Sequence, residues 1–168
     1  MKNRFLWIFI PVFLFSITGC GIYSFTGASI SPDVKTVSIK YFPNNAPLVQ
    51  ATLSRKFTEA LRDKFTSQTN LSMVPSNGDL NIEGEITGYS TEPVAIQSDQ
   101  KAAQQRLKIT INVRFTNKKD EKQNFETSFT RYEDYPSGLQ LSAVEDGLID
   151  KINDYLTQDV FNKAVVNW

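Results

Sequence analysis

The feature that most constrains the fold is a strict alternation of apolar and polar side chains at residues 106–117, RLKITINVRFTN. Because side chains two positions apart on a strand point to the same face, this segment is predicted to be a strand with one buried face and one solvated face. The turn-like sequence KKDEK follows, and NFETSFTRY at 124–132 alternates again, which predicts a β-hairpin. Such a hairpin is typical of an antiparallel sheet that is covered on one face only.

Two earlier segments, 34–42 and 79–90, alternate in the same way and are also predicted to be strands. In the second of them the alternation groups Gly88 with the apolar side chains and places Tyr89 on the polar face. Residues 71–75 are compatible with a further short strand.

Two segments carry apolar residues at helical spacing, 48–65 and 142–166, and each is predicted to be an amphipathic helix. Ser142 with Glu145 three positions later has the pattern of a capping box, which marks the start of a helix. The elements follow in the order β-α-β-β-β-α. The predicted fold is therefore α+β, with a mostly antiparallel sheet of about four strands and two helices packed on one face. Residues 34–168 are expected to form a single domain.

The amino terminus has the three parts of a secretory signal peptide in the expected order. Basic residues come first, an apolar run follows at 5–17, and small residues directly precede Cys20. The stretch ITGC resembles the lipobox of bacterial lipoproteins, in which the cysteine is acylated after cleavage. We therefore expect a lipoprotein signal peptide at 1–19 and a lipidated tether at 20–33. The alternative is a secreted protein with a free or buried cysteine.

The composition excludes several kinds of chemistry. The chain has no histidine and one cysteine, which excludes Cys/His zinc sites and both Ser-His-Asp and Cys-His catalysis. Eighteen basic side chains balance eighteen acidic ones without a basic block, which argues against nucleic-acid binding. Glu83 and Glu85 lie two apart on a predicted strand and are the remaining candidates for acid–base catalysis or for binding a hard cation. A solvated sheet face explains them better, and no cofactor or metal is predicted.

Residues 91–105 are rich in glutamine, have no clear period, and are predicted to form a long loop or an extension of the sheet. Basic side chains lie at the edge of this segment and near the ends of the predicted strands. Such cations can contact the phosphates of an anionic lipid, although ordinary surface charge is the simpler explanation for each of them. The candidates are Lys101, Arg106, Lys108, Arg114 and Arg131.

Three strings of the sequence, CGIYSFTG at 20–27, VKTVSIKYFPNNAPL at 34–48 and LNIEGEITGY at 80–89, resemble the LptE family of lipoproteins in its Bacteroidetes branch. The predicted order of helices and strands is also similar to the fold of that family, a sheet with two helices on one side. The resemblance extends over essentially the whole chain from Cys20 onward.

The resemblance implies a non-enzymatic lipoprotein of Gram-negative bacteria, held by acyl chains such as palmitate on the periplasmic side of the outer membrane. It implies that the protein plugs the LptD β-barrel, supports assembly of that barrel, and contacts lipopolysaccharide on its way to the cell surface. Cys20 is the only functional residue that the resemblance transfers. Two alternatives remain at this point, a solitary lipid- or glycan-binding lipoprotein and a hydrolase that uses Glu83 and Glu85.

Overall fold

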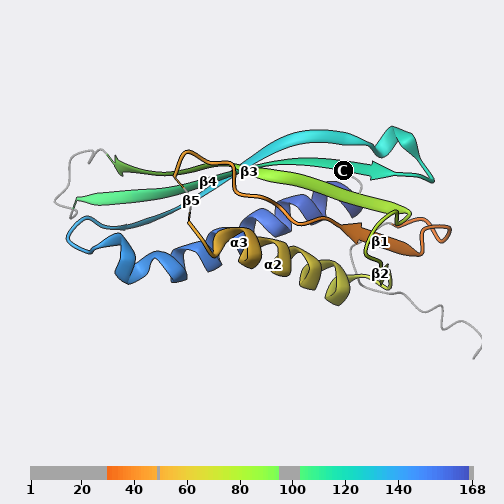
Figure 1. Ribbon diagram of the computed structural model, residues 1–168, viewed down its shortest axis with the longest axis horizontal. Helices are drawn as coiled ribbons and strands as arrows, with labels where there is room; N and C mark the ends of the chain where they lie inside the picture. The colour runs from red at the N-terminus through yellow and green to blue at the C-terminus, as the bar shows by residue number, and fades with distance from the viewer. Residues whose placement is uncertain (1–29, 49, 95–102, 167–168) are drawn as a thin grey trace, which may run out of the picture.

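Five strands form one sheet in the computed structural model, which describes residues 30–48, 50–94 and 103–166 (Figure 1). The order across the sheet is β2-β1-β3-β4-β5. β1 runs parallel to both β2 and β3, whereas β3, β4 and β5 are antiparallel. The strands are β1 (Thr36–Ile39), β2 (Ser72–Met73), β3 (Leu80–Val94), β4 (Gln104–Asn117) and β5 (Phe125–Pro136).

The predicted α+β class is confirmed, but the estimate of about four strands is one too low and the sheet is mixed. The fifth strand is the two-residue β2, which lies inside the 71–75 segment. The chain passes through a helix after β1 before it returns to the sheet, and such a crossover brings the next strands back parallel to β1.

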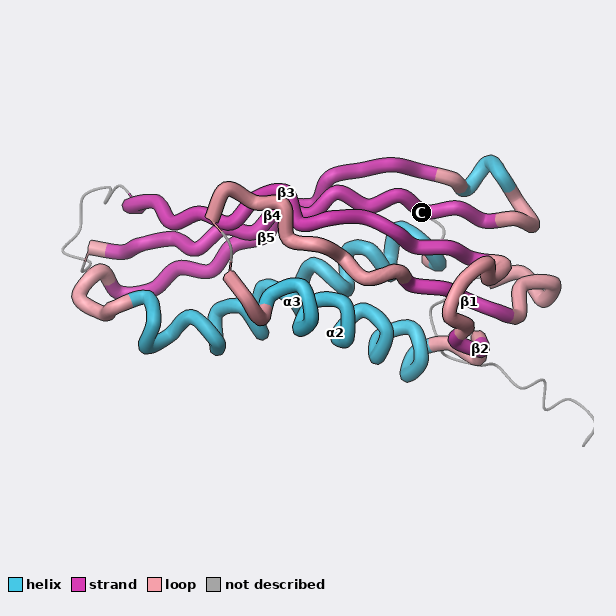
Figure 2. Tube along the Cα trace, viewed as in Figure 1, coloured by secondary structure: helices cyan, strands magenta, loops and turns pink. Residues whose placement is uncertain are grey.

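Two helices, α2 (Leu53–Gln68) and α3 (Leu141–Val165), cover one face of the sheet (Figure 2). Their apolar stripes follow the predicted spacing and are largely buried, with Ala60 and Val144 half-buried. The residues with no exposed surface are Leu53, Phe57, Leu61, Phe65, Ile149, Ile152, Leu156 and Val160. Edge-to-face ring contacts join Phe57 to Phe42 at 5.0 Å and Phe65 to Phe161 at 5.1 Å between ring centroids. The two helices therefore pack closely against the sheet and against each other.

No helix in the described part of the chain is long and apolar enough to cross a membrane.

A β-bulge in β3 changes which side chains face the helices. The register against β4 shifts between Ile86 and Gly88, so Tyr89 lies opposite the buried Ile109. Tyr89 is 7% exposed, and the prediction that it lies on the polar face is wrong. A bulge adds one residue to one strand, so a strict alternation assigns every side chain beyond it to the wrong face.

The hydroxyl group of Tyr89 donates a hydrogen bond to the carboxylate of Glu145 in α3. Burial, reinforced by this carboxylate, raises the pKa of Tyr89. The predicted capping box is therefore wrong, because α3 begins at Leu141 after Gln140 and has no side-chain cap. Glu145 binds the sheet instead of its own helix terminus.

The glutamine-rich segment is in part an extension of the sheet. β3 continues to Val94 and β4 begins at Gln104, so both ends of the segment form a ladder, while residues 95–102 lie outside the described residues. Cys20 and Lys101 also lie outside them.

The carboxylate of Asp79 links the start of β3 to the start of β1 through hydrogen bonds. Its Oδ2 accepts hydrogen bonds from the backbone N–H groups of Lys35 and Thr36, at 2.9 and 3.0 Å, and from the Thr36 hydroxyl group at 3.0 Å. These bonds, the one from Lys35 above all, lower the pKa of Asp79 from 3.8 to about 2.

We expect the stability of the Asp79→Asn protein to change less with pH, as the pH falls from about 4 to about 2, than the stability of the wild type. The pKa is lower in the folded than in the unfolded chain, so this contribution is complete above about pH 4 and is lost as the pH falls through about 2. Thermal unfolding between pH 6 and pH 2 measures it. The variant should be less stable than the wild type at pH 6 and should approach it at low pH. Asp33→Asn, at an exposed aspartate, is the control, and an equal loss at every pH would contradict the assignment.

Candidate functional site

The sheet face that points away from the helices, the upper side of the sheet in Figure 1, is polar over the described strands. We call it the outer face. In antiparallel strands, residues directly opposite each other point to the same side, so the register of β4 with its neighbours determines which side chains meet there. Its charged residues are Lys40, Glu83, Glu85, Glu92, Arg106, Lys108, Arg114, Glu126 and Asp134.

At one end of the outer face, Arg106 and Asp134 lie opposite each other and form a two-pronged ion pair. The distances are 2.7 Å from Nε to Oδ1 and 2.9 Å from Nη2 to Oδ2. The guanidinium group also lies 3.6 Å from the centroid of the Tyr132 ring. The hydrogen bonds from Arg106 lower the pKa of Asp134. Next to this pair, Lys108 binds Glu92 with an N–O distance of 3.2 Å.

At the other end, a shallow depression of about 310 Å³ is lined by charged side chains. Arg114 contacts Glu126 at 2.9 Å and Glu83 at 3.6 Å, and Lys40 contacts Glu83 at 2.6 Å. The hydrogen bonds from Arg114 and Asn112 lower the pKa of Glu126. This network ties β1, β3, β4 and β5 together.

The two candidate acid–base residues do lie together, as the sequence predicts, because both line this depression. Glu83 is held by two cations, and the Oε2 atom of Glu85 accepts a hydrogen bond of 2.5 Å from the Asn45 side chain. Over the described residues there is no group of three acidic, histidine or cysteine side chains that could hold a metal ion. The polar partners of Glu83 and Glu85 explain why these two carboxylates lie on the outer face.

The outer face is nearly neutral, because its four cations meet five carboxylates. The cations are Lys40, Arg106, Lys108 and Arg114, and the carboxylates are Glu83, Glu85, Glu92, Glu126 and Asp134. All four cations have a carboxylate partner within the described residues. An incoming phosphate must therefore compete with a carboxylate that is already bound.

Three of the five predicted basic residues share one face of the sheet, and a fourth lies on the opposite face. Arg106, Lys108 and Arg114 lie on the outer face, whereas Arg131 lies opposite Ile109 and faces the helices. Its guanidinium group forms two hydrogen bonds, of 2.6 and 2.7 Å, to Asp159 of α3. Arg131, grouped with these cations as a candidate lipid contact, therefore lies on the opposite side of the sheet.

The sequence contained the signal for this separation. Phe125, Thr127 and Phe129 mark the positions of β5 that point toward the helices, and Arg131 follows at the same spacing. The carboxylate partners on the outer face were not identified from the sequence, because pairing Arg106 with Asp134 requires the exact register of the β4–β5 hairpin, which the alternation of each strand does not provide.

Comparison with known proteins gives one family and several similar folds. Residues 34–164 match the family model described as LptE, lipopolysaccharide-assembly. The comparison with curated proteins found no match.

Solved structures with the same arrangement include a minor lipoprotein from Acinetobacter baumannii. It is 14% identical, with a TM-score of 0.51, and the match covers 77% of this chain and 91% of that one. A hypothetical protein from Chlamydia trachomatis is 10% identical, with a TM-score of 0.52 and coverage of 80% and 99%. At these identities the similarity shows the fold alone. The family match covers the whole two-layer domain described above, and this chain belongs to the LptE lipopolysaccharide-assembly family.

Proposed function

We propose that the protein is a non-enzymatic lipoprotein that plugs an LptD-type β-barrel and supports its assembly during lipopolysaccharide transport to the cell surface. Acylated Cys20 holds it on the periplasmic side of the outer membrane, and residues 20–33 form the tether. The observation that carries the proposal is the match of residues 34–164 to the LptE family.

The outer face is the surface that we assign to the wall of the barrel. The lumen of a wide barrel is polar and wet, so a plug needs a surface of hydrogen-bonding groups without a large apolar patch. The cross-strand ion pairs of Arg106 and Arg114 meet this need, because they leave the surface polar and nearly uncharged. Thr110 and Thr130, whose hydroxyl oxygens are 2.9 Å apart, provide further polar groups between the two pairs.

Contact with lipopolysaccharide belongs to the same proposal, with Lys101, Arg106, Lys108 and Arg114 as the candidate side chains. At Arg106 a lipid phosphate has to displace Asp134, so binding there is predicted to be weak while the ion pair is intact.

The structure offers no support for a solitary lipid-binding protein. That function needs an apolar cavity, and the natural place for it is between the helices and the sheet. The side chains that fill this space are fully buried, Phe57 and Ile152 among them.

Affinity purification tests the proposal. Tagged protein extracted from membranes in mild detergent is expected to retain a large outer-membrane barrel protein. The matched control carries residues 1–33 fused to an unrelated soluble domain, which reproduces the anchor without the plug. If the barrel is absent from the first sample, or present in equal amount in both, the plug function is refuted.

A further inference from the structure

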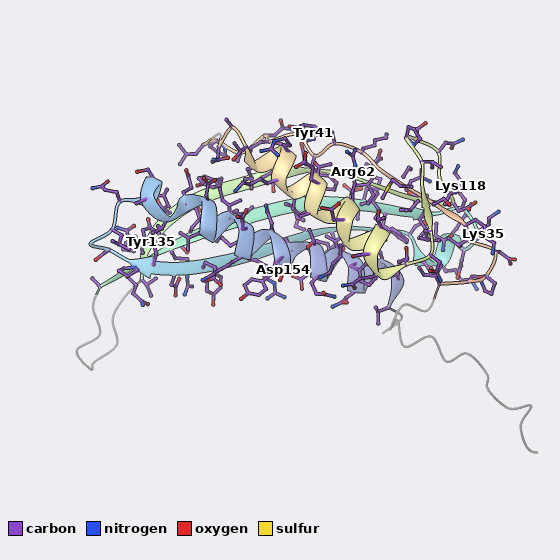
Figure 3. The ribbon with its side chains drawn as sticks, turned by 90° about the horizontal axis from the view of Figure 1, so that it is seen from below. Lys35, Tyr41, Arg62, Lys118, Tyr135 and Asp154 are labelled. Carbon is purple, nitrogen blue, oxygen red and sulfur yellow. The ribbon has the colours of Figure 1, made fainter. Side chains whose placement is uncertain are left out.

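The helix layer contains a second polar feature, on the side of the molecule opposite the outer face. A groove of about 540 Å³ runs between α2 and α3, which lie side by side when the molecule is seen from below (Figure 3). It is lined by Lys56, Glu59, Ala60, Asp63, Lys64, Ser67, Gln68, Asp150, Asn153, Asp154 and Thr157.

Asn153 is the unusual residue of this groove. It is 3% exposed, and neither its side-chain nitrogen nor its side-chain oxygen has a hydrogen-bond partner. It is the only buried side chain in the described residues with unpaired polar atoms. Leaving a buried amide unpaired is costly, and native proteins rarely do so without a reason. Two buried hydroxyl groups in this layer are paired: that of Thr58 accepts from the Phe42 backbone N–H and donates to the Ser54 carbonyl, and that of Thr157 donates to the Asp154 carbonyl.

The hydrogen-bonding capacity of this side chain indicates what it would bind. A carboxamide offers one acceptor and two donors, which matches the C=O and N–H of a peptide group. Asn153 lines the groove but its polar atoms are buried, so a ligand reaches them only when a flexible side chain moves aside. Lys64, which also lines the groove, is the candidate, because its ion pair with Asp154 is long, at 3.7 Å.

The charge of the groove indicates the rest of the ligand. Four carboxylates line it, from Glu59, Asp63, Asp150 and Asp154, against two ammonium groups. Among the described residues Asp63 has no ion-pair partner, and Lys56 already contacts both Asp146 and Asp150. Glu59 is itself paired with Arg55 at 2.9 Å, so Asp63 is the carboxylate that leaves the groove net negative, and this charge favours a basic ligand. The tether at 20–33 contains no lysine or arginine, so it does not complement the groove.

We propose that the α2–α3 groove is a docking site for an extended segment of a partner polypeptide that carries lysine or arginine side chains. One peptide group of the segment pairs with the Asn153 amide. A basic side chain of the segment replaces Lys64 at Asp154 or binds Asp63. This site lies on the helix layer and does not depend on the role of the outer face.

A peptide titration of the full processed protein in detergent tests the proposal. The probe is acetyl-Gly-Lys-Ser-Lys-Gly-amide. Its matched controls are acetyl-Gly-Glu-Ser-Glu-Gly-amide and putrescine, a dication without a peptide group. We expect saturable binding of the lysine peptide alone, with a shift of the side-chain amide resonance of Asn153 in NMR spectra.

Two variants separate docking from stability. Asn153→Leu removes the unpaired amide and keeps the branched shape of the side chain, so we expect its Tm to rise by a few degrees while affinity for the lysine peptide falls about tenfold or more. Asp63→Asn is expected to weaken binding at low salt with no change in Tm. Glu121→Gln, in the exposed turn between β4 and β5, should alter neither.

Several results would overturn the proposal. Equal binding of the lysine peptide and putrescine would show that only charge is sensed. No binding of the lysine peptide, or unchanged binding by Asn153→Leu, would show that the amide is merely hydrated. Reversible dimerisation abolished by Asn153→Leu would assign the groove to a second copy instead.

Discussion

We expect Gly84→Ala to lower the free energy of unfolding by about 3 kcal/mol or more, the largest effect of any glycine-to-alanine substitution among the described glycines. A Cβ atom at this position would lie 2.1 Å from the backbone oxygen of Asn112 and 2.6 Å from Cε1 of Phe42. Phe42 is fully buried, and Asn112 belongs to the paired strand β4. Neither can move without opening the sheet or the core.

Gly147→Ala is the matched control, and it should have the opposite sign. Gly147 is an exposed interior residue of α3, and an added Cβ would meet no atom within 4 Å. Replacing glycine by alanine inside a helix stabilises it by about 0.5–1 kcal/mol. Urea unfolding of both variants measures the contrast. Similar effects of the two substitutions would mean that the close approach at Gly84 is wrong.

The second large effect is expected at the lipidation site. Cys20→Ala should abolish acylation and leave the protein uncleaved or mislocalised. Each buried CH₂ group contributes about 0.8 kcal/mol to membrane binding, so several acyl chains hold the domain essentially permanently and their loss releases it. Fractionation of inner and outer membranes, with the apparent mass of the protein, measures the outcome.

Ser24→Ala, four positions further along the predicted tether, is the control for Cys20→Ala and should fractionate like the wild type. If the Cys20→Ala protein is still processed and recovered with the outer membrane, the lipoprotein assignment is refuted. The domain itself should fold in both variants, because the two-layer core begins only near Val34.

The sequence predicted the parts of the fold that depend on local patterns. Alternation identified the buried face of β4 from Leu107 to Phe115, and helical spacing identified the stripes of α2 and α3. These patterns arise because one face of each element is buried, and they can be read without knowing what the element packs against.

The errors arose where the fold departs from a local pattern. The bulge after Ile86 turned Tyr89 toward α3, where it binds Glu145 and removes that carboxylate from the predicted cap. The two-residue β2 is too short to produce a pattern, and its pairing with β1 depends on the crossover through α2.

The sequence identified the cations of the candidate site but not their carboxylate partners. Alternation placed Lys108 and Arg114 on the polar face of one strand, but it could not show that Glu126 neutralises Arg114 or that Arg106, expected at the edge of the glutamine-rich segment, pairs with Asp134. Ion pairs across strands depend on register, which is determined by the whole sheet. Because carboxylates pair with these cations, the outer face is polar and nearly neutral instead of basic. Such a surface supports the proposal that it faces the wall of a barrel.

Photocrosslinking tests directly whether the outer face lies against the wall of a barrel protein. A photoreactive benzoylphenylalanine is placed at Ser128, which is exposed on the outer face of β5, and in a second protein at Lys151, which is exposed on α3. We expect irradiated cells to yield an adduct of the Ser128 protein with a large outer-membrane barrel, and much less adduct from the Lys151 protein. An adduct from Lys151 alone would contradict the assignment of the outer face, and no barrel adduct from either position would contradict the plug function itself.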